Sequence, residues 1–122
     1  MRLTGDFFHI VSTEVLADGF ACRVHLRAEH PIYRVHFPGN PVTPGACLMQ
    51  MATELLEAQQ GRPLRLHRAV NIRFKKTIGN EAELTFRFSK VGPDGDELRA
   101  AVSIDEEGYG QCVKMSLRFK EV

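Results

Sequence analysis

Apolar and polar residues alternate along most of this chain, a pattern that predicts β-strands with one buried face. In the first quarter, residues 20–26 carry apolar side chains at every second position, and residues 7–11 form a weaker strand candidate. After Pro63 the alternation returns in the segments 64–78, 84–88, 98–104 and 113–119. The turn-like breaks between these segments are short enough for antiparallel neighbours, and they lie at 79–80, 92–95 and 106–110.

One segment follows the helical period instead. Within residues 44–60 the apolar positions recur at i, i+3, i+4 and i+7, and Gly61 ends the element. Its first two turns are apolar almost all round, so we expect a sheet to enclose this helix. The order of elements predicts the α+β class, with an antiparallel sheet wrapped around one long central helix.

Size and composition narrow the class of protein. The chain has 122 residues, the length of one domain, and we assign residues 1–122 to a single domain. No apolar stretch approaches the roughly 20 residues of a membrane span, and the N-terminus lacks the apolar region of a secretory signal. The net charge of +1 disfavours nucleic-acid binding, which usually needs a strongly basic face.

The cysteines and most histidines give no sign of a disulfide or metal centre. Cys22, Cys47 and Cys112 are far apart and form no C-x-x-C pair, so we expect reduced thiols in a cytoplasmic protein. Cys47 has two interpretations, a thiol activated in an open site or a small buried hydrophobe, and the second is favoured. We predict no metal, because the remaining histidines lack ligand spacing; these are His9, His25, His30 and His67.

The chemistry-bearing segment is the run His36-Phe37-Pro38-Gly39-Asn40-Pro41-Val42-Thr43-Pro44-Gly45. His36 precedes a loop that proline stiffens, and histidine is the commonest general base. A packing or capping role for His36 is the simpler alternative. Pro44 and Gly45 come where the helix begins, and a helix N-terminus presents unpaired N–H groups to an anion or a carbonyl. Close packing at Gly45 is a second interpretation, compatible with the first.

This run resembles the signature of the 3-hydroxyacyl-[acyl-carrier-protein] dehydratases, a hot-dog-fold family. The resemblance implies that His36 takes the α-proton of an acyl thioester and that the Gly45 N–H polarises its carbonyl. It also implies that Phe37, Pro38, Gly39 and Pro44 bind the substrate. No cofactor is implied beyond the phosphopantetheine of a carrier protein or of coenzyme A. The family architecture implies a homodimer, in which each site combines the histidine loop of one subunit with the helix of the other.

Two positions depart from the family pattern. Gln50 stands where the family has an acidic residue, and an amide can hydrogen-bond to a leaving hydroxyl group but cannot protonate it. Val35 stands where the family usually has glycine. Glu54, one turn after Gln50, is the nearest substitute carboxylate, although a solvent-exposed stripe of the helix is its commoner role.

Three functions therefore stay open. The first is a dehydratase acting on acyl thioesters in fatty-acid, lipid or polyketide synthesis. The second is an acyl thioesterase, and the third is a non-catalytic subunit that binds an acyl group or a carrier. Basic residues after the helix suggest a docking edge for an acidic carrier protein or a phosphate, or equally a solvated face; they are Arg65, Arg68, Arg73, Lys75 and Lys76. Acyl-chain length would depend on the side chains that close the tunnel, such as Met51, Phe74 and Phe86.

Overall fold

The computed structural model describes residues 2–122 and contains one six-stranded sheet with the order β1-β2-β4-β5-β6-β3. All neighbouring strands pair antiparallel. The strands are β1 (Phe8–Leu16), β2 (Gly19–Leu26), β3 (Leu64–Phe74), β4 (Glu83–Asp94), β5 (Glu97–Glu106) and β6 (Gly110–Glu121). The helices are α1 (Ile32–Val35) and α2 (Gly45–Gln60).

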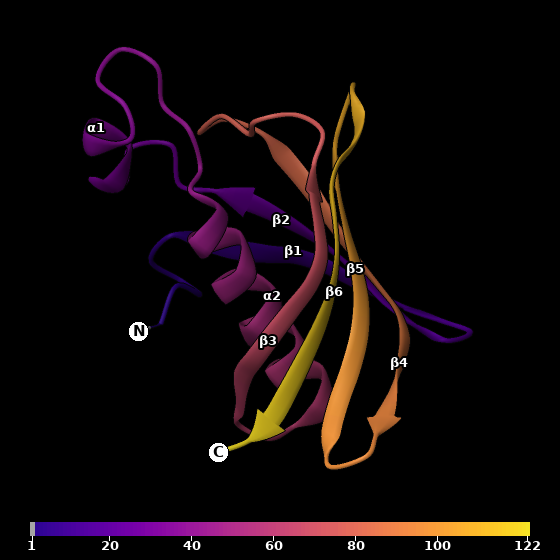
Figure 1. Cartoon of the computed structure of the whole chain (residues 1–122). Helices are drawn as coiled ribbons and strands as arrows, with labels where there is room; N and C mark the ends of the chain where they lie inside the picture. Colours follow the sequence, from indigo (N-terminus) through magenta and orange to yellow (C-terminus); the bar gives the residue numbers. More distant parts are fainter. Residues whose placement is uncertain (1) are drawn as a thin grey trace.

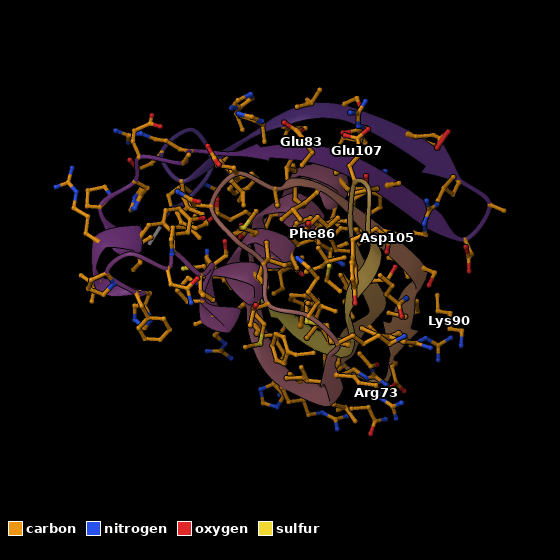
Figure 2. All side chains as sticks on the ribbon, turned by 90° about the horizontal axis from the view of Figure 1, so that it is seen from above. Arg73, Glu83, Phe86, Lys90, Asp105 and Glu107 are labelled. Carbon is orange, nitrogen blue, oxygen red and sulfur yellow. The ribbon has the colours of Figure 1, made fainter. Side chains whose placement is uncertain are left out.

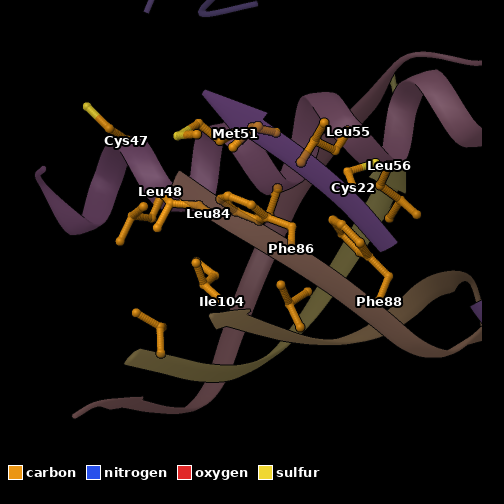
Figure 3. Packing of buried hydrophobic residues seen from close by; sticks show 14 of the residues in the cluster. Cys22, Cys47, Leu48, Met51, Leu55, Leu56, Leu84, Phe86, Phe88 and Ile104 are labelled. Atoms are coloured by element: carbon orange, nitrogen blue, oxygen red, sulfur yellow. The ribbon is translucent and has the colours of Figure 1, made fainter. Parts of the chain in front are cut away.

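The long helix α2 lies against the concave side of the curved sheet (Figure 1). Side chains on its apolar face point at the inward side chains of the strands, as Figure 3 shows for Met51 and Leu55 opposite Phe86. Met51 and Phe86 are both fully buried. The alternating pattern of the sequence therefore describes the inner face of this sheet, and the predicted architecture of a sheet wrapped around one helix is confirmed.

Several predicted boundaries are wrong. β1 continues to Leu16 instead of ending near residue 11, because pairing with β2 carries it along a segment with no apolar alternation. β3 ends at Phe74, four residues before the predicted end. β4 runs on to Asp94 through residues assigned to a turn, since a register shift between Ser89 and Gly92 lets the strand pair across them. The sequence also gave no sign of the single-turn helix α1.

Both edges of the sheet expose apolar residues. β3 forms one edge, and it exposes Ile72 (37%) and Phe74 (54%) beside charged residues. β1 forms the other edge, and its side chains are nearly all exposed, Ile10, Val11 and Val15 among them. An open edge strand leaves backbone N–H and C=O groups available to a further strand. None of the described helices is long and apolar enough to span a bilayer.

Candidate active site

His36 directly follows α1 and begins the loop that leads to α2 (Figure 1). Its backbone is held on both sides, because its N–H donates to the carbonyl oxygen of Ile32 (3.0 Å) and its own carbonyl accepts from Val42 (2.7 Å). Phe37 and Asn40 exchange two backbone hydrogen bonds of 3.1 and 2.9 Å, which closes the turn at Pro38 and Gly39. Within residues 2–122 the imidazole of His36 makes no hydrogen bond or ion pair. The structure thus presents a half-buried imidazole on a backbone that is held on both sides.

Gly45 is the first residue of α2, and its backbone N–H has no acceptor among the described residues. Pro44, the N-cap residue, offers no side-chain hydrogen bond, and its carbonyl accepts from Cys47 and Leu48 one turn further on. Unpaired N–H groups at a helix start carry partial positive charge. Gly45 can therefore donate to a carbonyl oxygen placed at the end of the helix.

Phe74 lies close to Gly45 at the end of β3. A methyl group added at Gly45 would come within 3.0 Å of the ring carbon Cζ of Phe74. The packing interpretation of Gly45 is therefore correct, and it coexists with an unpaired N–H. Phe74 is half-exposed, whereas the other residues proposed to close an acyl tunnel, Met51 and Phe86, lie in the core.

Gln50 and Glu54 interact with each other instead of lining α2 as a solvent-exposed stripe. Glu54 is 2% exposed. Its Oε2 accepts from Nε2 of Gln50 and from the backbone N–H of Leu3, both at 2.8 Å, and its Oε1 accepts from the N–H and the hydroxyl of Thr4. The prediction that Glu54 is solvated is thus wrong, because the N-terminal segment folds over this part of the helix.

The surroundings of Glu54 also fix its protonation state. Burial alone would raise the pKa of the carboxyl, but the hydrogen bonds from Thr4, Gln50 and Leu3 outweigh it and hold the pKa below its ordinary value. An ionised carboxylate with this many donors has no proton to give at neutral pH. Glu54 is accordingly an anchor for the N-terminal segment and a poor candidate for a catalytic acid.

Phe37, Pro38 and Gly39 line an open hollow of about 520 Å³ together with Tyr33 and residues of the neighbouring loops. Phe37 is half-exposed there, and its ring centroid lies 5.1 Å from that of His36. Pro44 belongs to the helix start and does not line this hollow. The structure therefore divides the four proposed substrate-binding residues between two places along one loop.

Two residues that the sequence analysis passed over hold this loop from inside. The hydroxyl of Tyr33 lies 2.9 Å from Oγ1 of Thr43, which in turn donates to the carbonyl oxygen of Gly79 at 3.0 Å. Both side chains are buried. A buried hydroxyl needs a partner, and Thr43 stands inside the conspicuous run, but the sequence contains no signal that Tyr33 reaches it.

The three cysteines are buried and free. Burial raises the pKa of the Cys47 thiol, which favours its interpretation as a small hydrophobe over an activated nucleophile. Across residues 2–122 no group of three or more His, Cys, Asp and Glu side chains could hold a metal ion. Three of the remaining histidines lie instead next to carboxylates: His25 next to Glu83, His30 next to Asp6, and His67 next to Glu97.

Only part of the predicted basic edge belongs to one surface. Arg73 and Lys75 line a groove of about 620 Å³ with basic residues of three other strands, namely Lys90, Arg99, Lys114 and Arg118. Figure 2 shows Arg73 and Lys90 well separated from the acidic Glu83 and Glu107. Arg68 and Lys76 lie outside this basic groove and pair with Glu97 and Glu106. Pairing between strands brings the basic side chains together, so the groove was not visible in the order of the sequence.

Comparison with known proteins identifies the fold. The chain matches the model of the ApeI-like family, described as ApeI dehydratase, over residues 13–111. No curated protein shows significant similarity to it. Among solved structures, the dehydratase heterocomplex ApeI:P from Xenorhabdus doucetiae superposes with a TM-score of 0.75 at 12% identity, covering 92% of this chain and 96% of that chain.

Two further structures carry different activities on the same fold. A hypothetical thioesterase with coenzyme A from Streptococcus pneumoniae TIGR4 gives a TM-score of 0.65 at 11% identity, covering 94% of this chain and 85% of that chain. An (R)-hydratase from A. caviae gives a TM-score of 0.53 at 18% identity, covering 80% of this chain and 74% of that chain. At these identities the structural matches establish the hot-dog fold, as predicted, and leave the reaction to be argued from the site.

Proposed function

This chain belongs to the ApeI-like dehydratase family, and we propose that it catalyses the reversible dehydration of a 3-hydroxyacyl thioester. The observation that carries the proposal is the placement, at the two ends of one hydrogen-bonded loop, of two groups that have no partner among residues 2–122. The loop begins at the imidazole of His36 and ends at the N–H of Gly45. A base and a carbonyl-polarising donor are the two groups that removal of an α-proton requires.

In the proposed reaction, His36 takes the proton from the α-carbon, and the electron pair of that C–H bond moves toward the thioester carbonyl. The Gly45 N–H stabilises the negative charge that develops on the carbonyl oxygen. The electron pair then returns to form the α,β double bond, the bond from the β-carbon to the hydroxyl group breaks, and water leaves. The hydroxyl group needs a proton to leave as water.

The source of that proton follows from the helix residues. Gln50 cannot transfer a proton, and Glu54 is held ionised by its donors. We infer that the imidazolium of His36 returns the proton it has taken, so one residue serves as base and then as acid.

The open edge of β3 supports the homodimer that the family architecture implies. Ile72 and Phe74 are exposed there, next to unpaired backbone groups of an edge strand. A second copy paired along β3 would cover both residues. Two-fold pairing is the commonest arrangement of homo-oligomers.

The basic groove supports substrate delivery on an anionic carrier. Arg73, Lys90, Arg99 and Lys114 have no ionic partner among the described residues, although the whole chain carries a net charge of only +1. An acyl carrier protein or the phosphates of coenzyme A would complement this charge. The buried free thiols agree with a reducing, cytoplasmic location for such a reaction.

The test is the hydration of a short trans-2-enoyl thioester, supplied on coenzyme A and on a carrier protein, and followed by loss of the enoyl absorbance. We expect His36→Ala to lower the rate by about 10²–10⁴-fold. His9→Ala, at an exposed histidine on β1, is the matched control and is expected to retain the rate. Equal rates for the two variants would contradict the role of His36.

A thioesterase is the second candidate, because an imidazole base could activate water and the same N–H would stabilise a tetrahedral intermediate. Release of free thiol in the same assay, without loss of the enoyl absorbance, would identify hydrolysis. Binding of the acyl thioester without either reaction would identify a non-catalytic subunit.

A further inference from the structure

A short buried chain of hydroxyl groups crosses the loop between His36 and Gly45. Thr43 donates its only hydroxyl proton to the carbonyl oxygen of Gly79, at 3.0 Å. Because that proton is used, the hydrogen bond of 2.9 Å between Tyr33 and Thr43 has the phenol of Tyr33 as donor. The two side chains are only 5% and 3% exposed, so water does not compete for these bonds.

The chain joins the two parts of the proposed site. Tyr33 lies in α1, three residues before His36, and the N–H of His36 is bonded to Ile32 in the same turn. Thr43 stands two residues before Gly45, and its own N–H donates to the carbonyl oxygen of Ile78 at 2.7 Å. A movement of α1 relative to the start of α2 would therefore break a buried hydrogen bond.

Packing alone does not account for the hydroxyl of Tyr33. Its ring stacks on Phe7, with centroids 5.6 Å apart and an interplanar angle of 24°, and a phenylalanine would keep that stack. Burial raises the pKa of the Tyr33 phenol above its ordinary value. The hydrogen bond with Thr43 acts in the opposite direction, but burial has the larger effect. The phenol therefore stays protonated and remains a donor through the neutral range.

We propose that Tyr33 and Thr43 are positioning residues, which fix the imidazole of His36 relative to the N–H of Gly45 through the hydrogen bond between their hydroxyl groups. The proposal rests on the proposed function, because it assigns a purpose to the distance between those two groups. Tyr33 also lines the hollow beside Phe37, but its hydroxyl group is bonded to Thr43, which does not line that hollow. Small displacements of reacting groups reduce the rate strongly without an equal loss of binding.

The experiment compares Tyr33→Phe, Thr43→Val and Thr43→Ser in the hydration assay. We expect Tyr33→Phe and Thr43→Val to lower kcat by about 10-fold, with KM changed by less than about twofold. Thr43→Ser keeps the hydroxyl and is expected to restore most of kcat. Tyr109→Phe is the matched control at an exposed tyrosine and is expected to behave as the native protein.

The double variant Tyr33→Phe with Thr43→Val separates positioning from general destabilisation. Since both changes remove the same bond, its kcat should be no lower than that of Thr43→Val alone. Native kcat in both single variants would overturn the proposal. So would a loss of kcat that follows the melting temperature of each variant and is not rescued by Thr43→Ser.

Failure of the proposed function would look different. If the native protein hydrates no enoyl thioester, the reaction assignment is wrong, and the positioning can still be read from the imidazole signals of His36 in NMR spectra. A single sharp set of signals in the native protein that broadens or doubles in Tyr33→Phe, and not in Tyr109→Phe, would support positioning. Unchanged signals in Tyr33→Phe would overturn it.

Discussion

Nε2 of Gln50 donates a hydrogen bond of 2.8 Å to Oε2 of Glu54, one turn further along α2. The same carboxylate oxygen accepts from the N–H of Leu3, so the amide and the N-terminal segment share one acceptor. This arrangement commits the carboxylate of Glu54 to the fold. It also leaves the proposed reaction without a carboxylic acid, which shapes the predictions for both residues.

Glu54→Gln should destabilise the fold, because a neutral amide would place its own donors against the N–H groups of Leu3 and Thr4. Hydrogen bonds to a charged group contribute about 1.5–3 kcal/mol each, and we expect a loss of about 2–3 kcal/mol at pH 7. Urea unfolding of the native protein and the variant measures this loss of unfolding free energy. Glu14→Gln, at an exposed residue of β1, is the matched control and should change the free energy of unfolding by less than about 0.5 kcal/mol.

The same carboxylate predicts a pH dependence. The pKa of Glu54 is lowered in the folded state, so its contribution is fully present above the unfolded-state pKa of about 4.3. It is lost as the pH falls through the lower folded-state pKa. The difference in unfolding free energy between the native protein and Glu54→Gln should therefore shrink from pH 7 toward pH 3. A difference that stays constant over this range would contradict the assignment.

Gln50→Glu should restore a general acid. The new carboxyl would lie beside the ionised Glu54, and repulsion between like charges raises the pKa of the incoming group toward neutrality. We expect dehydration to accelerate by about 10–10²-fold, within the range of general acid catalysis, with a new acidic group in the pH–rate profile. Gln59→Glu, on the exposed end of the same helix, is the control, and an equal change in both variants would show that charge alone is responsible.

Gly45→Ala should lower activity by displacing Phe74, since the methyl group would come 3.0 Å from its ring. The backbone N–H is retained and the ring is half-exposed, so we expect a change in stability of less than about 1 kcal/mol. Combining it with Phe74→Leu should recover part of kcat. If kcat does not recover in the double variant, the loss of activity arises from a change at the N-terminus of α2 and not from displacement of Phe74.

Ile72→Asp should dissociate the proposed homodimer, because it puts a charge on the apolar part of the β3 edge. Analytical ultracentrifugation should show the native protein as a dimer and this variant as a monomer with reduced activity. Val15→Asp places the same charge on the opposite edge, at a residue that is 76% exposed, and should leave the dimer intact. Dissociation in both variants, or in neither, would contradict pairing along β3.

Reversing charge in the basic groove should weaken binding of a carrier-borne substrate. We expect Arg99→Glu with Lys114→Glu to raise KM for the carrier-bound enoyl thioester by at least about 10-fold, and to make binding less sensitive to salt. Arg87→Glu, at an exposed residue of β4 outside the groove, is the control. Identical KM values for the groove variant and this control would contradict a role of the groove in binding the carrier.

The sequence by itself determined the elements whose side chains alternate by burial. The period-2 segments became β2 and β4 to β6, and the helical period of residues 44–60 became α2, because burial of one face selects for these patterns. It also placed His36 and Gly45 at the two ends of a loop, since the turn-forming residues between them have strong local preferences. The strands, the helix and the loop between them can be predicted because each depends on residues close together in the sequence.

The tertiary structure decided what depends on residues far apart in the chain. Glu54 is buried where the N-terminal segment, 51 positions earlier in the chain, donates to it. Thr43 is held by Tyr33 and by Gly79, and the basic groove forms only when β3 to β6 lie side by side. The length of β1 and the end of β3 follow from strand pairing in the same way. Such contacts leave no period in the sequence, because the free energy that favours them arises between segments after they have packed together.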